Sequence, residues 1–221
     1  RFAPEAKCLV MVREPIQNCE SWIRTHFKSN DYKNIAVRIL GMLFDIDDPI
    51  YKQQNAIGVR LEDLKEHPRE TILSLCEWIG IEEEECLYKM TAQGKRWWGD
   101  PSSPDYELDN MEPFGVSAVR RPKGAIFSDN DQFILNTLFY PFNIRFGYEQ
   151  ENTEQFKRDL ESVRPMLDNL FDFEKQIIKA MKIDKENFKQ SGNYLYLRSG
   201  LKNRCSVLER HYNYPDLLEA L

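Results

Sequence analysis

The chain has 221 residues, of which 42% are hydrophobic and 30% are charged, and its formal net charge is −6. Such a chain can bury a substantial core as one large domain or a domain with an appendage, and its composition excludes a disordered protein. The acidic balance argues against nucleic-acid binding, which requires a basic face that releases counterions. A phosphate site here would therefore be a local cluster of basic residues.

The cysteines indicate a reduced, cytoplasmic protein. They are odd in number and have no metal-ligand spacing, so we expect free thiols and no metal site. They are Cys8, Cys19, Cys76, Cys86 and Cys205. No apolar run approaches the ~18 residues of a membrane span and no signal peptide is visible, which predicts no membrane partner. Because the chain enters a predicted strand almost at once, we expect further polypeptide before residue 1.

The first predicted element is a strand over residues 6–12, whose nearly continuous apolar run is typical of a strand buried on both faces. Arg13 follows this strand, and Pro15 stands where a helix would begin. At that edge of a parallel sheet, the next helix directs N–H groups and partial positive charge at an anion. Ser21 lies about two turns along this helix and could share an oxyanion with Arg13. Alternatively, Arg13 caps the strand edge and Ser21 faces solvent.

The following segments alternate between helix and strand. Helical periodicity predicts helices, and a short apolar run predicts a strand, before a last helix that starts at Pro68 and ends at Gly80. These elements cover residues 16–27 (helix), 35–44 (helix), 56–61 (strand) and 68–79 (helix). This order predicts an α/β fold in which right-handed crossovers join parallel strands.

Residues 91–125 lack periodicity, and such a long irregular stretch is usually functional or packs as its own unit. Trp97 and Trp98 in this stretch could line the pocket of a bound substrate or anchor the loop. A capping pattern at Ser128 and Asp131 then predicts a helix over 132–145. Beyond residue 148 the pattern is helical, so we predict an α/β part over 1–148 and an α-helical extension over 149–221.

Glu62-Asp63-Leu64, between the second strand and a helix that ends in glycine, carries a resemblance to a known family. It resembles the C-terminal half of sulfotransferases that use 3′-phosphoadenosine 5′-phosphosulfate (PAPS). In that family an Arg-Asp-Pro-like turn and a serine eight residues later bind the 3′-phosphate of the nucleotide. The resemblance therefore implies that Arg13 and Ser21 form this part of the cosubstrate site.

A third segment, over residues 120–124, is similar to the basic loop that closes over the 3′-phosphate in this family. The resemblance implies that Arg121 or Lys123 donates to phosphate oxygens and that Gly124 lets the backbone approach. Guanidinium and backbone N–H donors suit a phosphate dianion. Pro122 has no counterpart in the family's usual Arg-Lys-Gly form, and ordinary solvated basic residues are the alternative interpretation.

The resemblance implies an enzyme with the P-loop NTPase-like sulfotransferase fold, a parallel sheet flanked by helices, without its N-terminal part and with the helical extension of bacterial members. The expected reaction moves a sulfuryl group from PAPS to a hydroxyl or amine of a small-molecule or carbohydrate acceptor, without a metal. The 5′-phosphosulfate loop and the catalytic base belong upstream of Arg13, so the catalytic residues are expected before residue 1. Leu61 replaces the family's tyrosine that helps to hold the adenine.

Two other functions are compatible with the same sequence. One is a non-catalytic binding or scaffold protein that kept the sulfotransferase fold. The other is a P-loop nucleotide kinase, which shares the sheet topology and would need a Gly-Lys-Ser/Thr loop upstream. The sequence does not predict the acceptor, the oligomeric state or the role of residues 149–221.

Overall fold

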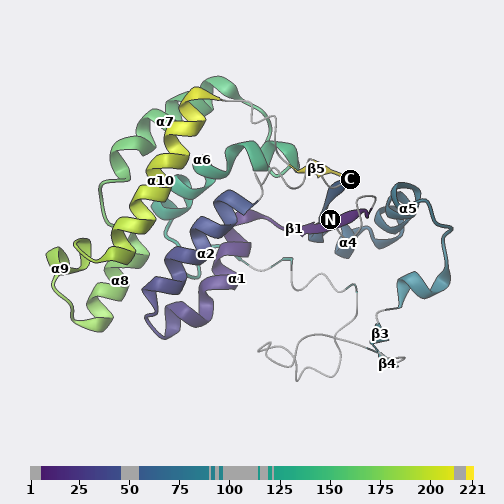
Figure 1. Cartoon of the computed structure of the whole chain (residues 1–221), viewed down its shortest axis with the longest axis horizontal. Helices are drawn as coiled ribbons and strands as arrows, with labels where there is room; N and C mark the ends of the chain where they lie inside the picture. The colour runs from purple at the N-terminus through teal and green to yellow at the C-terminus, as the bar shows by residue number, and fades with distance from the viewer. Residues whose placement is uncertain are drawn as a thin grey trace.

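The computed structural model describes residues 6–45, 55–89, 91–92, 95–96, 114, 119–120, 122–211 and 218–221. The described residues form a small parallel sheet and many helices, with α4 and α5 at one end of the sheet and the larger group of helices at the other, which confirms the expected α/β class (Figure 1). The first elements are β1 (Cys8–Val12), α1 (Pro15–Lys28), α2 (Tyr32–Asp45), β2 (Ala56–Arg60), α4 (Leu61–Glu66), α5 (Pro68–Ile79), η1 (Glu85–Tyr88), β3 (Thr91–Ala92) and β4 (Lys95–Arg96). The later elements are α6 (Asp129–Arg145), α7 (Thr153–Met166), α8 (Asp172–Met181), α9 (Lys185–Lys189), α10 (Gly192–Arg210) and β5 (Glu219–Ala220). Within these residues, no helix has the length and apolarity to cross a membrane.

Among the described residues, three parallel strands form the sheet in the order β1, β2, β5. Val12 at the end of β1 is opposite Arg60 at the end of β2, so the two strands finish level with each other. The turn into α1 and the turn into α4 consequently lie side by side at the carboxyl edge of the sheet. The strands β3 and β4 form a separate antiparallel pair.

The strand β1 is not buried on both faces, so that prediction is wrong. Leu9 is 43% exposed and Met11 is 45% exposed, whereas Val12 is buried. Leu9 and Met11 alternate with the partly buried Cys8 and Val10 along β1, so they share one face of the strand, and that face is largely open to solvent. An apolar run predicts a strand, but the burial of that strand depends on distant elements.

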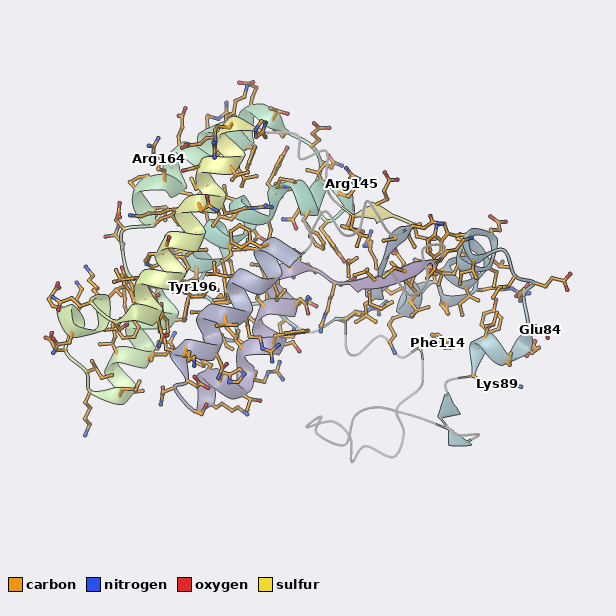
Figure 2. The ribbon with its side chains drawn as sticks, viewed as in Figure 1. Glu84, Lys89, Phe114, Arg145, Arg164 and Tyr196 are labelled. Carbon is orange, nitrogen blue, oxygen red and sulfur yellow. The ribbon has the colours of Figure 1, made fainter. Side chains whose placement is uncertain are left out.

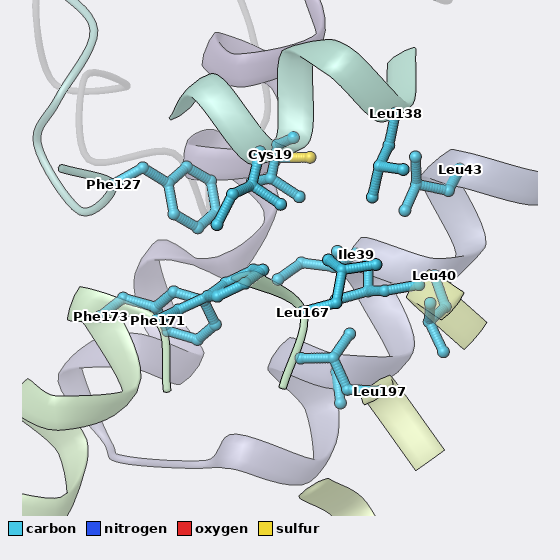
Figure 3. Close-up of a cluster of buried hydrophobic side chains, with 14 of the residues drawn as sticks. Cys19, Ile39, Leu40, Leu43, Phe127, Leu138, Leu167, Phe171, Phe173 and Leu197 are labelled. Carbon is cyan, nitrogen blue, oxygen red and sulfur yellow. The ribbon is translucent and has the colours of Figure 1, made fainter. Parts of the chain in front are cut away.

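The helix α6 joins two hydrophobic cores. Its first half packs with helices α1, α2, α7, α8 and α10 in a large helical core (Figure 3). Its end, near Arg145 in Figure 2, carries Phe142 and Phe146 into a smaller core with Val12 and Leu218 at the sheet. The helices predicted as an extension therefore share a core with α1 and α2, and β5 from the same segment joins the sheet.

A buried charged group lies within the helical core. The carboxylate of Glu174, on α8, accepts hydrogen bonds from the hydroxyl of Tyr32, the guanidinium of Arg198 and the backbone N–H of Phe171. Burial raises the pKa of Glu174, and Arg198 opposes that rise. The guanidinium of Arg198 also stacks on the rings of Phe171 and Tyr194. These contacts link the start of α2 to α8 and α10.

At Gly200, α10 packs closely against Leu40 of α2. A Cβ atom at Gly200 would lie 2.5 Å from Cδ2 of the buried Leu40, whereas a Cβ at Gly192 of the same helix meets open space. We predict that Gly200→Ala lowers the free energy of unfolding by about 1–3 kcal/mol through overpacking, despite the higher helix propensity of alanine. Urea denaturation checks this against Gly192→Ala, which should keep or slightly raise stability. A Gly200→Ala variant as stable as Gly192→Ala would contradict the close packing.

Candidate functional site

The candidate site lies at the carboxyl edge of the sheet, where α1 begins. Arg13 leaves β1 there, and Pro15 is the first helical residue of α1. Glu14 is the N-cap of α1, and its Oε2 atom accepts the backbone N–H of Gln17 over 2.8 Å. The positive end of the α1 dipole lies next to Arg13 and favours an anion there, although Pro15 has no N–H and the N–H of Gln17 is already bonded to Glu14.

Glu62 holds the two neighbouring turns together. Its Oε1 atom accepts the backbone N–H of Glu14 over 3.0 Å, and its Oε2 atom accepts the hydroxyl of Tyr148 over 2.8 Å. The guanidinium of Arg60 lies 4.7 Å from the ring centre of Tyr148. Burial raises the pKa of Tyr148, with a further contribution from the Glu62 carboxylate, so this hydroxyl remains a donor. The Glu-Asp-Leu segment is thus the junction between β1, β2 and the end of α6.

Arg13 and Ser21 are on one side of α1, with Gln17 between them. The Nη2 atom of Arg13 donates to Oε1 of Gln17 over 3.0 Å. Ser21 is exposed and follows Gln17 by four residues, which places it on the same helix face and about 6 Å further along the axis. Gln17 therefore separates Arg13 from Ser21 along this face of the helix.

The segment around Lys123 is brought to the same place. Its Nζ atom donates to Oε1 of Glu14 over 2.7 Å, next to Arg13 in the chain. Arg120 pairs with Glu66 of α4 over 3.2 Å. Gly124 has a φ of +91°, a conformation that glycine adopts without strain. Of the predicted residues, Arg13 and Lys123 are thus at the start of α1, Gly124 follows Lys123 in the chain and Ser21 is half-way along α1, whereas Arg121, Trp97 and Trp98 lie outside the described residues.

A buried carboxylate anchors the end of this basic segment. Glu20, on α1, is only 3% exposed, and its Oε1 atom accepts the backbone N–H groups of Ile126 and Phe127 over 2.8 and 2.9 Å. A charge with two such donors is well placed, because buried carboxylates need hydrogen bonds to offset desolvation. Glu20 therefore fixes the position of residues 123–127 relative to α1.

A pocket of about 340 Å³ adjoins Arg13 between β1, α1, α2 and α6. Its polar side chains are Arg13, Asn18 and Arg38, and the guanidinium of Arg38 stacks 4.7 Å from the ring centre of the exposed Trp22. None of the described residues that line it carries a carboxylate. In an acidic molecule, such a lining favours a ligand with an anionic part and an apolar part.

Comparisons with family models, with curated proteins and with solved structures find no match to this chain. A function must therefore be inferred from the residues and geometry of the chain itself. No group of three or more potential metal ligands occurs within the described ranges.

The sequence did not identify three side chains that build this site. Glu14 caps α1 and binds Lys123, Gln17 binds Arg13, and Glu20 anchors residues 126 and 127. Glu14 and Gln17 have the spacing of an N-cap and the third helical residue, which could have signalled a paired role. Glu20 adjoins the apolar face formed by Ile16, Cys19 and Ile23, and an acid beside a buried face is a recognisable signal.

Removal of the Glu20 carboxylate should weaken the attachment of residues 123–127 to α1. We predict that Glu20→Ala lowers the free energy of unfolding by roughly 2–4 kcal/mol, because two buried N–H groups lose their acceptor. Glu20→Gln keeps one acceptor oxygen and should lose less. Chemical denaturation measures both, with Glu161→Ala on the exposed face of α7 as the control. Equal stability of Glu20→Ala and Glu161→Ala would mean that the anchor contributes nothing.

Proposed function

We propose that this chain is the C-terminal part of a PAPS-dependent sulfotransferase of the P-loop NTPase-like fold. The observation that carries the proposal is the contact between Lys123 and Glu14, which are 109 residues apart. Two of the motifs that resemble the family, the Arg13 turn and the 120–124 segment, therefore meet at one point. Glu62, from the third motif, accepts the backbone N–H of Glu14 at the same junction.

The donors available at this junction suit a phosphate dianion. Arg13 would offer its guanidinium, Ser21 its hydroxyl and the start of α1 its positive dipole end to the 3′-phosphate of the cosubstrate. Lys123 would exchange the Glu14 carboxylate for a phosphate oxygen, and Gly124 would let the backbone come close. The pocket beside Arg13 adds apolar surface and a second arginine, Arg38, without a carboxylate.

The cosubstrate would supply the sulfuryl group, and positioning and charge stabilisation would account for most of the catalysis, by analogy with phosphoryl transfer. In this proposal the described residues hold the nucleotide, and the 5′-phosphosulfate loop and catalytic base belong upstream of Arg13. The acceptor would be a hydroxyl or amine of a small molecule or carbohydrate. Trp97 and Trp98 are candidates for stacking against a sugar ring.

Selective binding of the 3′-phosphate tests the proposal. We predict that the chain binds adenosine 3′,5′-bisphosphate more tightly than adenosine 5′-monophosphate in calorimetry. Arg13→Ala should weaken binding of the bisphosphate by about 1.5–3 kcal/mol, the range for hydrogen bonds to charged groups, and Ser21→Ala by less. Arg158→Ala, on the exposed face of α7, is the control. The proposal fails if the two nucleotides bind with equal affinity.

The carboxylate of Glu14 should oppose the phosphate. We predict that Glu14→Gln strengthens binding of adenosine 3′,5′-bisphosphate by roughly 1 kcal/mol, because it releases Lys123 and removes a negative charge near the phosphate. The glutamine oxygen can still accept the N–H of Gln17, so the cap of α1 is kept. Calorimetry at two salt concentrations measures the effect, and Lys123→Ala should change affinity in the opposite direction. Weaker binding by Glu14→Gln with an unchanged melting temperature would contradict this account of Lys123.

A further inference from the structure

Gln17 occupies the third helical position of α1, where a glutamine side chain usually accepts a hydrogen bond from the N-cap residue. In a capping box, the side chain at this position reaches back to the backbone N–H of the N-cap residue. Here the N–H of Glu14 donates instead to Oε1 of Glu62 over 3.0 Å. Glu62 thus replaces Gln17 in the capping box.

The amide oxygen of Gln17 is turned to Arg13. It accepts Nη2 of Arg13 over 3.0 Å, while the backbone N–H of Gln17 remains bonded to the Glu14 side chain. A long arginine side chain has many rotamers, and an acceptor fixed on a helix restricts them. The acceptor is on the face of α1 that leads to Ser21, one turn further on.

From these contacts we propose that Gln17 is a positioning residue, which holds the guanidinium of Arg13 along α1 for the 3′-phosphate of the nucleotide. This inference rests on the proposed function and deepens it, because it assigns selectivity for the 3′-phosphate to a residue outside the three motifs. Gln17 acts through Arg13. Its contribution therefore disappears when Arg13 is removed.

The helix α7 provides a matched control. Gln155 occupies the same third position there, and its N–H bonds to the N-cap Asn152 over 3.0 Å. Its side chain contacts Asp159 and Arg158 of the same exposed helix face. Gln155→Ala therefore reports the general effect of losing a glutamine at this position.

The test compares binding of adenosine 3′,5′-bisphosphate and adenosine 5′-monophosphate by calorimetry. Gln17→Ala should lower affinity for the bisphosphate roughly three- to tenfold and leave affinity for the monophosphate unchanged. Gln17→Glu should lower it more, because its charge neutralises Arg13. Arg13→Ala/Gln17→Ala should bind no more weakly than Arg13→Ala. Independent, additive losses in the double variant, or an equal effect of Gln155→Ala, would overturn the proposal.

A second measurement needs no nucleotide. In ¹⁵N spectra of the arginine side chains of the free 221-residue chain, Gln17→Ala should shift and broaden the Arg13 guanidinium signals, and Gln155→Ala should not. Unchanged Arg13 signals in Gln17→Ala would overturn the positioning role. If the wild type binds both nucleotides equally, the proposed function fails, and the spectra still decide whether Gln17 holds Arg13.

Discussion

The hydrogen bond from the backbone N–H of Glu14 to the carboxylate of Glu62 is the contact on which the carboxyl edge of the sheet depends. It ties the turn after β1 to the turn after β2, and the second oxygen of Glu62 ties both to Tyr148 at the end of α6. A carboxylate with two well-directed donors resists rearrangement, because each donor would otherwise need a new partner. The start of α1 is therefore tied to the neighbouring turn through the backbone of Glu14, and the guanidinium of Arg13 contacts Gln17 in the first turn of the helix.

The same edge combines opposing charges. Glu14 and Glu62 are acidic, yet Arg13, Arg60 and Lys123 are arranged around them. Each carboxylate has hydrogen-bond donors in the structure, so the acids organise the site, and the basic groups determine which ligand it favours. Because the acidic groups are engaged in structural hydrogen bonds and the basic groups line the site, a chain with a net charge of −6 can still present a local site for an anion.

Local patterns predicted the elements well. The helix over 68–79 has the expected bounds, and Ser128 accepts the N–H of Asp131 as the capping pattern indicated. Asp131 itself does not complete that box; its carboxylate accepts the N–H groups of Asp172 and Phe173 and so caps α8. A partner 41 residues away leaves no trace in local spacing. The exposed face of β1 was missed for the same reason, and so was the contact between Gln17 and Arg13, because the capping spacing alone predicts a different bond.

The position of α6 in both cores has a consequence for local unfolding of the protein. Leu138 belongs to the helical core and Phe142, one turn later, to the core at the sheet, and Pro141 between them has no backbone N–H, so one hydrogen bond of the helix ladder is missing at the boundary. Helix hydrogen bonds are lost cooperatively, and this break in the ladder lies between the two parts of α6 that belong to different cores. Local unfolding of the sheet edge can therefore end at Pro141 and leave the part of α6 in the helical core folded.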